Sequence, residues 1–451
     1  MPEKVNVIYC CAKLWKGLRK VRCIYNRYWA IMYDSIEWSE VKYDRRNAVK
    51  INIPDNVKHI IAQLEGAGFE AWAVGGCVRD SLMGRDPKDW DITTSALPEQ
   101  IKSIFRRTID TGIAHGTVTV MLDGVGYETT TYRIDGKYSD SRHPDSIEFT
   151  RSLGEDLKRR DFTINAMAYS DTKGLVDLFG GASDLKNHII RCVGDPSERF
   201  AEDALRILRA IRFSAQLGFE VDPHTMKATS KLKDRLNKIS AERIHSELDK
   251  TLLSPYPERF RLIHSSGIDS VILPELSDSI QADPLLLKNL CGTLKNSPKN
   301  GHIRWAVLLS ATGGNIGILK RLKFDNNSIH IISELLRLEK TELTGLTDSE
   351  MRHIMYDAGA ENLPLLFQYR QTLHPDTDLS PAEAQYRTIL ERGDCTCIKD
   401  LNVKGTDLLN AGVPSGAEIG ITLRKLLEEV LNDPSLNTKE LLLDKVKQWR
   451  G

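Results

Sequence analysis

The sequence predicts an α+β fold in which an N-terminal head built on a mixed β-sheet is followed by helical segments only. Short apolar strand patterns lie between residues 70 and 150, whereas from about Asp195 onward the hydrophobic spacing is helical. Strands first and helices after are typical of an α+β domain joined to helical domains. The length of 451 residues corresponds to roughly two to four domains. Its 41% hydrophobic and 27% charged residues are the composition of an ordinary globular protein.

The individual elements follow from hydrophobic spacing and turn residues. Val57, Ile60, Ile61 and Leu64 recur at helical spacing, which predicts a helix over residues 57–67. Asp123-Gly124 is a hairpin turn signal between two strand patterns. The other predicted elements are strands over 70–74, 90–93, 116–122, 125–131 and 147–150, a short helix that ends at Leu82, and a buried helical turn over 163–168.

The charge balance at first argues against a nucleic-acid partner. The chain has 62 Lys and Arg against 62 Asp and Glu, a formal net charge of zero, whereas proteins that bind polyanions usually carry a basic excess. Whole-chain charge averages over all faces, however. Acidic residues can gather in one site while basic residues line one side, so an RNA partner remains compatible with the composition.

The cysteines and the apolar runs indicate a cytoplasmic protein. The eight cysteines are scattered, unlike the dense framework of a small secreted domain. The close pair Cys395 and Cys397 has no second pair nearby to complete a zinc site. We therefore expect free thiols in a reducing cytoplasm. No run of 18 apolar residues occurs, so no membrane span is expected.

Residues 1–48 differ from the rest of the chain. They are rich in Cys, Trp, Tyr and basic residues, and charges interrupt the apolar core that a signal peptide needs. We expect a disordered or artefactual extension, such as one added by an upstream start codon. A basic arm that contacts RNA is the alternative.

The clearest chemical signal is a glycine turn followed by two aspartates. In a strand, Asp89 and Asp91 would point the same way, about 6–7 Å apart, with Trp90 opposite. Two such carboxylates can hold two divalent cations for nucleotidyl transfer, and oxygen ligands beside phosphates favour Mg²⁺. Upstream, Gly75-Gly76 lets backbone N–H groups approach a phosphate at a helix N-terminus, and Arg79 can pair with the same triphosphate. An Asp-x-Asp pair alone is most often a surface feature, but the combination favours a triphosphate-plus-metal site.

Three later segments allow two interpretations each. Glu128, in the predicted strand 125–131, either supplies a third carboxylate or faces solvent. The polar connection 133–144 is functional or disordered, as long polar loops usually are, and we assign no catalytic role to its His143. The basic run Lys158-Arg159-Arg160 either faces phosphate or is a solvated surface.

A charged helix face follows Glu202. Ala204, Leu208, Ile211 and Ala215 form its apolar side. Asp203, Arg206 and Arg209 share another surface about 120° wide, and Arg212 lies at its far edge. This face is either an exposed set of i,i+3 charge pairs or a reader of a nucleobase edge. In the second case, Asp accepts from an exocyclic amino group and Arg donates to the ring.

These residues closely resemble the family of class II tRNA nucleotidyltransferases (CCA-adding enzymes) and bacterial poly(A) polymerases, of the polymerase-beta type. The resemblance runs from about residue 53 to the C-terminus and is most specific up to about residue 220. Its motifs are Gly75-Gly76-x-x-Arg79-Asp80 with Asp89-x-Asp91, Arg159-Arg160-Asp161-Phe162-Thr163-Ile164-Asn165-Ala166, Glu202-Asp203-x-x-Arg206, and a tail segment from Leu401 to Leu408 with Gly412, Gly416 and Gly420.

The resemblance implies a role for each motif. It implies Mg²⁺ bound by Asp89 and Asp91, and Gly76, Arg79 and Arg160 around the incoming nucleotide. Asp203 and Arg206 would act as a protein template for CTP and ATP, with Arg209 and Arg212 nearby. The tRNA 3′-hydroxyl would attack the α-phosphate and release pyrophosphate.

The resemblance also implies a division of the chain and leaves alternatives open. The expected parts are a nucleotidyltransferase head over 53–182, a helical neck that recognises the base over 183–255, a helical body over 256–380 and a tRNA-binding tail over 381–451. The loop 133–144 is present, which is compatible with A addition after C, C. A poly(A) polymerase keeps the same core motifs, but no basic C-terminal extension occurs here. Addition of A alone, a small-molecule nucleotidyltransferase and an inactive RNA-binding protein are further alternatives.

Overall fold

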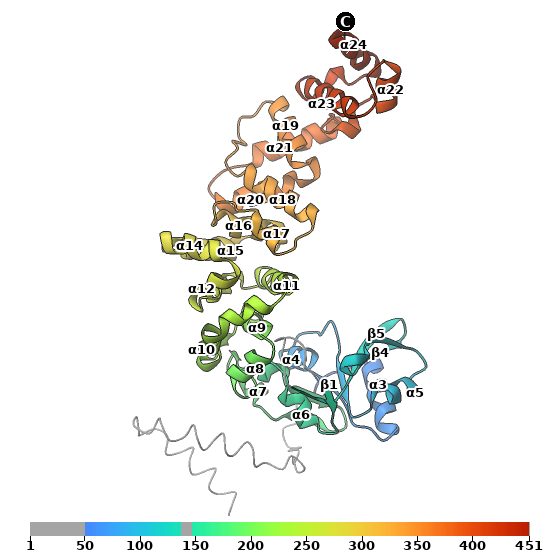
Figure 1. The fold of residues 1–451 in the computed structure, drawn as a ribbon, viewed down its shortest axis with the longest axis vertical. Coiled ribbons are helices and arrows are strands. Elements are labelled where there is room, and N and C mark those ends of the chain that lie inside the picture. Colours follow the sequence, from blue (N-terminus) through green and yellow to red (C-terminus); the bar gives the residue numbers. More distant parts are fainter. Residues whose placement is uncertain (1–49, 137–146, 451) are drawn as a thin grey trace, which may run out of the picture.

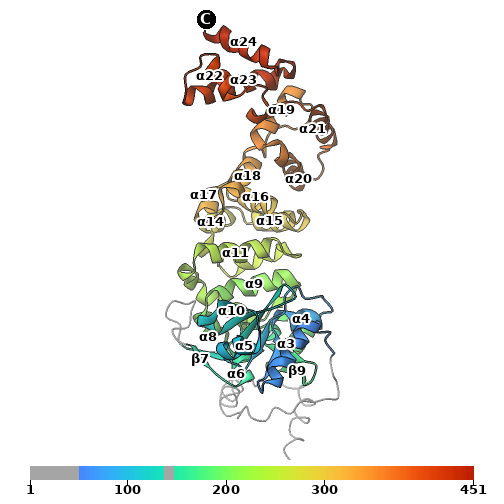
Figure 2. The ribbon, with the colours of Figure 1, turned by 90° about the vertical axis from the view of Figure 1, so that its right-hand side faces the viewer.

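The computed structural model describes residues 50–136 and 147–450. The molecule is elongated, with a sheet-containing head at one end and helices that stack away from it up to α24 at the other (Figures 1 and 2). The predicted α+β class, with a mixed sheet first and helices after it, is confirmed. Within the described ranges no helix is long and apolar enough to cross a membrane. The predictions for residues 1–48 and for loop positions 137–144, His143 included, lie outside the described residues.

The head is built on a seven-stranded mixed sheet in the order β3-β4-β5-β2-β1-β8-β9. Strand β2 runs parallel to β5, with Ile92 opposite Thr129, and the other neighbours are antiparallel. The strands are β1 (Ala71–Val74), β2 (Ile92–Thr94), β3 (Thr108–Gly112), β4 (Thr117–Leu122), β5 (Val125–Thr131), β8 (Met167–Ser170) and β9 (Gly174–Asp177). Strands β6 (Arg133–Asp135) and β7 (Ile147–Phe149) form a separate pair.

Short helices surround this sheet. Helix α3 (Asp55–Gly66) buries the four apolar residues that predicted it, and it packs against β1. The hairpin turn at Asp123 and Gly124 has both residues at positive φ, 49° and 79°, as a two-residue hairpin requires. The remaining head helices are α4 (Gly76–Leu82), α5 (Pro98–Ile104), α6 (Leu153–Lys158) and α7 (Gly181–Lys186).

One predicted strand and one predicted helical turn differ from the structure, and the predicted set lacks β3, β6 and β9. The predicted strand 90–93 begins only at Ile92. The predicted helical turn over 163–168 ends as a 3-10 turn at Asn165, and Met167 and Ala168 belong to β8 instead. All four residues of β8 are buried. A strand covered on both faces lacks the alternation of polar and apolar residues that marks a strand in sequence.

Helices follow the head almost without interruption; the exception is a two-residue parallel pair of β10 (Ile189–Ile190) with β11 (Glu220–Val221). Helices α9 and α11 pack on each other. The helices are α8 (Pro196–Glu202), α9 (Leu205–Leu217), α10 (Pro223–Leu232), α11 (Ala241–Leu252), α12 (Arg261–Ser265), α13 (Asp269–Ile272), α14 (Pro274–Ala282), α15 (Leu285–Asn296), α16 (Gly301–Ser310), α17 (Gly317–Arg321), α18 (Asn326–Arg337), α19 (Asp348–Ala358), α20 (Leu363–Leu373), α21 (Ser380–Arg392), α22 (Gly405–Asn410), α23 (Ala417–Asn432) and α24 (Lys439–Arg450).

Two buried arginines join successive helical segments. Arg304 on α16, 5% exposed, donates to the carbonyls of Leu252, Ser254 and Ser297. Arg352 on α19, 4% exposed, donates to the Leu431 carbonyl at 2.8 Å and to the Asp394 carboxylate at 2.9 Å. Cys395 and the apolar residues that follow it form a hydrophobic core of their own, so the second arginine bridges two separate cores.

Gly181 offers a test of the head packing, because a Cβ there would lie 2.2 Å from the Thr163 carbonyl oxygen. We expect Gly181→Ala to lower the free energy of unfolding by about 1–3 kcal/mol, the usual range for overpacking. Gly292→Ala is the matched control, since a Cβ at this position in α15 meets nothing within 4 Å; it should leave stability unchanged or raise it by about 0.5–1 kcal/mol. Urea unfolding followed by circular dichroism measures both, and equal stability of the two variants would contradict the packing account.

Candidate nucleotide and metal site

The glycine turn between β1 and α4 brings backbone and arginine together. Gly75 has φ 84° and ψ −128°, a conformation that L side chains rarely adopt. A Cβ at Gly75 would lie 3.2 Å from Nη1 of Arg160. Gly76 begins α4. The turn therefore requires glycine both for its backbone angles and for the approach of this guanidinium.

The predicted carboxylates come together at the start of β2 and on the neighbouring central strand β5. Trp90 is 8% exposed, whereas Asp89 and Asp91 on either side of it are exposed, so the alternation holds although β2 begins one residue later. Glu128 on β5 precedes Thr129, the partner of Ile92, which places it across from Asp91. The pKa of Asp91 is raised by desolvation; Arg160 opposes this, and the negative charges of Glu128 and Asp89 add to it.

Two cavities adjoin these residues and share two arginines. The carboxylate cavity, of about 190 Å³, is lined by Val74, Asp91, Ile92, Thr117, Glu128, Thr130, Arg133, Arg159 and Arg160. The arginine cavity, of about 260 Å³, is lined by Arg159, Arg160, Asp161, Asp203, Leu205, Arg206, Arg209 and Arg243. Arg159 and Arg160 therefore connect the carboxylates of the sheet with the charged residues at the start of α9.

The arginine cavity holds five arginines and two aspartates, an excess of positive charge that suits an anionic ligand. Asp203 pairs with Arg243 on α11 at 3.1 Å. Arg206 donates to Glu202 at 2.6 Å and to the Arg159 carbonyl at 3.0 Å. These contacts are polar and directional, so the cavity can present both donors and acceptors to a planar polar group.

Asp161 forms the tightest pair in this cavity. Its carboxylate is 6% exposed and accepts from Nε and Nη2 of Arg209 at 2.8 and 2.5 Å. Burial pushes the pKa of Asp161 upward, but Arg209 and the Asn165 amide outweigh burial and bring it to about 2. Asp161 is thus ionised at neutral pH, and Arg209 is fixed against it.

Three predicted nucleotide-binding residues, Gly76, Arg79 and Arg212, are not among the residues that line the two cavities. Arg79 donates to Asn165 at 2.7 Å and to Asp80 at 2.8 Å. Arg212 is 9% exposed, pairs with Glu247 at 2.6 Å and lies over the Phe213 ring. Arg212 thus faces α11, which agrees with its predicted place at the edge of the charged surface.

Several residues of the site were absent from the predicted set. Arg159 and Asp161 lie within a motif that the sequence analysis identified, so their place in the site could have been predicted from that motif. Asp156 is 0% exposed and Arg243 comes from α11, beyond every motif. A lone aspartate in α6 and a lone arginine in α11 have no local pattern that reports their partners.

The donor set suits a divalent cation only in part. Asp89, Asp91 and Glu128 supply carboxylate oxygens, the donors that Mg²⁺ prefers. The pKa of Asp91 is raised first by desolvation and then by the negative charges of Glu128 and Asp89, and a bound cation would offset these charges. Within the described residues, however, no three His, Cys, Asp or Glu side chains are already close enough together to hold an ion. Substrate phosphates would have to complete the coordination.

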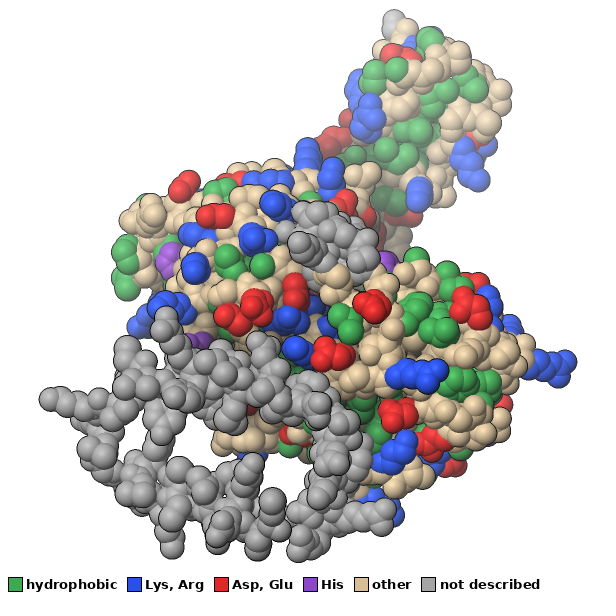
Figure 3. Space-filling view, turned by 60° about the horizontal axis from the view of Figure 1, so that its bottom comes forward, with side chains coloured by type: hydrophobic (Ala, Val, Ile, Leu, Met, Phe, Trp, Pro, Cys, Tyr) green, Lys and Arg blue, Asp and Glu red, His purple; other side chains and the backbone are tan. Residues whose placement is uncertain are grey.

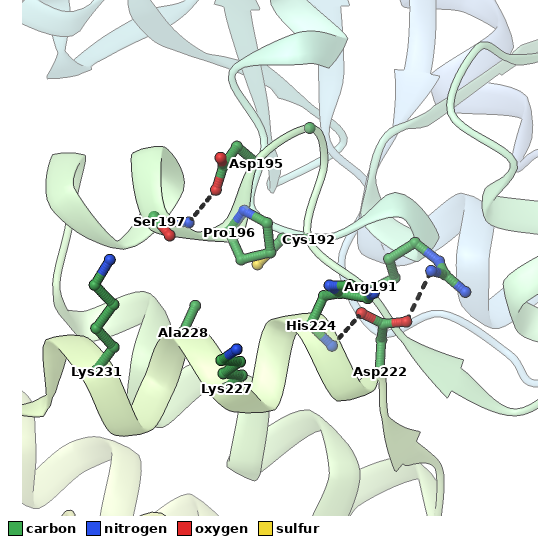
Figure 4. Close-up of a pocket in the computed structure, with 11 residues that line it drawn as sticks. Arg191, Cys192, Asp195, Pro196, Ser197, Asp222, His224, Lys227, Ala228 and Lys231 are labelled. Atoms are coloured by element: carbon green, nitrogen blue, oxygen red, sulfur yellow. Dashed lines mark hydrogen bonds and ion pairs between the residues drawn. The ribbon is translucent and has the colours of Figure 1, made fainter. Parts of the chain in front are cut away.

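A third cavity lies apart from this site. It encloses about 610 Å³ beside α10 and the start of α8 (Figure 4). Asp222 at its edge binds Arg191 at 2.8 Å and caps α10. Lys227 and Lys231 on α10 make no ion pair with any described residue. Figure 3 shows acidic and basic side chains intermixed over the face in view.

Comparison with known proteins places this geometry in context. Residues 71–191 match the family model "Poly A polymerase head domain", and 218–280 match "Probable RNA and SrmB- binding site of polymerase A". Residues 297–446 match a model of tRNA nucleotidyltransferase domain 2. The CCA-adding enzyme of Limosilactobacillus fermentum is 39% identical over 85% of this chain and 94% of its own length. That of Latilactobacillus sakei is 41% identical over 86% and 96%.

A solved structure agrees with these matches. The CCA-adding enzyme of Bacillus stearothermophilus, in complex with CTP, is 32% identical and superimposes with a TM-score of 0.74 over 87% of this chain and 97% of that one. The fold of the head and of the helical scaffold is thus that of a nucleotidyltransferase. Within that class, the chain belongs to the family of CCA-adding enzymes.

The Asp161–Arg209 pair predicts a pH-dependent loss of stability. Because the pKa of Asp161 is lowered on folding to about 2, its contribution is complete above the unfolded pKa of about 3.9 and disappears as the pH falls through 2. We expect Asp161→Asn to lower the free energy of unfolding at pH 7 by about 2 kcal/mol, and this deficit should shrink below pH 4. Urea unfolding over a pH series measures it. The exposed Asp110, paired with Lys102, is the control: Asp110→Asn should change stability by less than about 0.5 kcal/mol.

Proposed function

We propose that this chain adds C, C and A to the 3′ end of tRNA, using CTP and ATP and releasing pyrophosphate without a nucleic-acid template. The observation that carries the proposal is the sharing of Arg159 and Arg160 between the carboxylate cavity and the arginine cavity. A triphosphate held by these arginines would have its α-phosphate near the carboxylates and its base near α9. The relative solved with CTP supports this assignment.

In this proposal Asp89 and Asp91 hold Mg²⁺, and Glu128 is the third catalytic carboxylate. When bound, the metal ions would activate the attacking 3′-oxygen and neutralise charge on the leaving pyrophosphate. The protein brings the RNA end and the nucleotide together, which removes most of the entropic cost of their encounter. The 3′-oxygen forms a bond to the α-phosphorus, and the bond between the α-phosphorus and the oxygen that bridges to the β-phosphate breaks. The hydroxyl proton passes to a proton acceptor in the site.

The nucleotide would be held at both ends. Gly76, Arg79 and Arg160 would surround the triphosphate, where backbone N–H groups and guanidinium donors suit phosphate oxygens. Asp203 and Arg206 would read the base edge, with Arg209 and Arg212 behind them. Asp203 also pairs with Arg243, and Arg206 pairs with Glu202, so these protein contacts orient the two side chains that would read the base.

The remaining assignments follow the same scheme. Residues 53–182 would be the catalytic head, 183–255 the base-recognising neck, 256–380 the body and 381–451 a tail that binds tRNA. The elongated helical scaffold supports an acceptor as long as a tRNA stem. A protein with this substrate would work in the cytoplasm. Poly(A) synthesis is the second candidate, because the head matches a poly(A) polymerase model; addition of A alone is a third.

Nucleotide choice separates these candidates. We expect the purified protein with Mg²⁺ to extend tRNA that lacks its 3′ end by two C residues from CTP alone, and by CCA from CTP with ATP. Labelled products on a sequencing gel give the answer. Runs of A from ATP alone would identify a poly(A) polymerase, and A added only to tRNA ending in CC would identify the A-adding activity.

The metal assignment predicts the effect of removing one carboxylate. Asp91→Ala should reduce transfer by at least about 10³-fold, because it removes the charge that stabilises the transition state, while tRNA affinity by gel shift stays unchanged. Asp110→Ala is the control, an exposed aspartate on β3 that should retain full activity. Transfer by Asp91→Ala at the unmodified rate would refute the metal role.

A further inference from the structure

We propose that Asp156 is a positioning residue for the nucleotide: it holds Arg159 and Arg160 toward the two cavities and ties them to strand β2 beside Asp91. Asp156 lies on α6 and lines neither cavity. The proposed function gives Asp156 no contact with nucleotide, metal or RNA. The inference rests on the proposed function, because it concerns how the triphosphate would be bound.

Every acceptor position of the Asp156 carboxylate is occupied. Oδ1 accepts from Nε and Nη2 of Arg159 at 3.0 and 2.7 Å. Oδ2 accepts from Nη2 of Arg160 at 3.2 Å and from the Thr93 hydroxyl at 3.1 Å. The side chain is completely buried. Burial pushes its pKa upward, but the two guanidinium groups outweigh that effect and leave the pKa below its usual range.

The arrangement answers a problem of like charges. Arg159 and Arg160 are consecutive cations that both line both cavities, and two guanidinium groups so close repel each other. The negative charge of Asp156 between the two guanidinium groups offsets their repulsion. Because Arg159 donates two hydrogen bonds to Asp156, its side chain is restricted to rotamers that face the cavities. Asp156 therefore supplies preorganisation, which a flexible pair of arginines would otherwise gain only when nucleotide binds.

The contacts of Arg160 show where Asp156 directs its guanidinium group. Asp156 holds Nη2, which leaves Nη1 beside Gly75, 3.2 Å from the position of a Cβ. Arg160 and Asp91 line the same carboxylate cavity. The Thr93 hydroxyl lies two residues after Asp91. One buried carboxylate thus fixes the position of a phosphate-binding arginine relative to a metal-binding aspartate.

Asp184 provides a matched control within the same head. It is 6% exposed, accepts from the Thr163 hydroxyl at 2.7 Å and pairs with Arg191 at 3.1 Å. It therefore shares with Asp156 a buried carboxylate, a threonine and an arginine, but its partners line neither cavity. Asp184→Asn reports what the loss of a buried charge does to the head in general.

The test compares Asp156→Asn with Asp184→Asn in the full chain. Dissociation constants for CTP and ATP come from isothermal titration without RNA, and KM and kcat come from transfer to tRNA lacking its 3′ end. We expect Asp156→Asn to weaken both nucleotides about tenfold, equivalent to the loss of one charge-assisted contact, with the KM for tRNA unchanged. Asp184→Asn should lower the melting temperature comparably and leave nucleotide affinity unchanged. In an Arg160→Ala background, Asp156→Asn should have a smaller effect on nucleotide affinity.

Each outcome decides the question. If Asp156→Asn folds and binds both nucleotides as the unmodified chain does, Asp156 is structural only and the proposal fails. If Asp156→Asn does not fold, Thr93→Val, which removes one hydroxyl, carries the test: a rise of about threefold in both dissociation constants is expected, and unchanged values overturn the proposal. Failure of the unmodified chain to extend tRNA would refute the proposed function instead, because titration measures nucleotide binding independently of transfer.

Discussion

Arginine side chains crowd the junction between the sheet-containing head and α9, and the site depends on buried and half-buried carboxylates that neutralise and orient them. Asp156 engages Arg159 and Arg160, Asp161 engages Arg209, Glu202 engages Arg206, and Glu247 engages Arg212. A buried ion pair contributes little net stability, because desolvation offsets the attraction. Its value here is geometric. Each pair restrains the orientation of its guanidinium group, and Arg159, Arg160, Arg206 and Arg209 are held in this way among the residues that line the arginine cavity.

The carboxylate edge of the site shows the opposite condition. Asp89, Asp91 and Glu128 lie where negative charges reinforce one another, and Arg160 is the cation that opposes them at Asp91. An arginine-rich cavity and a carboxylate edge that share Arg159 and Arg160 form a gradient of charge across a short distance. Such a gradient suits the proposed ligand, a nucleotide with a polar base at one end and a triphosphate at the other.

Local sequence predicted the parts of the site that are made locally. The glycine turn, the aspartates around Trp90 and the hairpin that carries Glu128 follow from residue types at short spacing, and the structure brings them together. Strand β8 was missed because both its faces are buried, which removes the alternation. Asp156 and Arg243 were missed because their roles come from tertiary contacts with Thr93 and Asp203. No motif of one segment reports a partner 40 or 60 residues away.

The buried arginines of the helical scaffold have a different consequence. Arg304 and Arg352 donate largely to backbone carbonyls, of Leu252, Ser254, Ser297 and Leu431. A carbonyl is the same group whichever side chain its residue carries. The joints between these segments therefore depend mainly on two arginines and on the path of the chain. A substitution at Leu252 or Leu431 keeps the accepting carbonyl, whereas loss of either arginine would remove the donor of a whole joint.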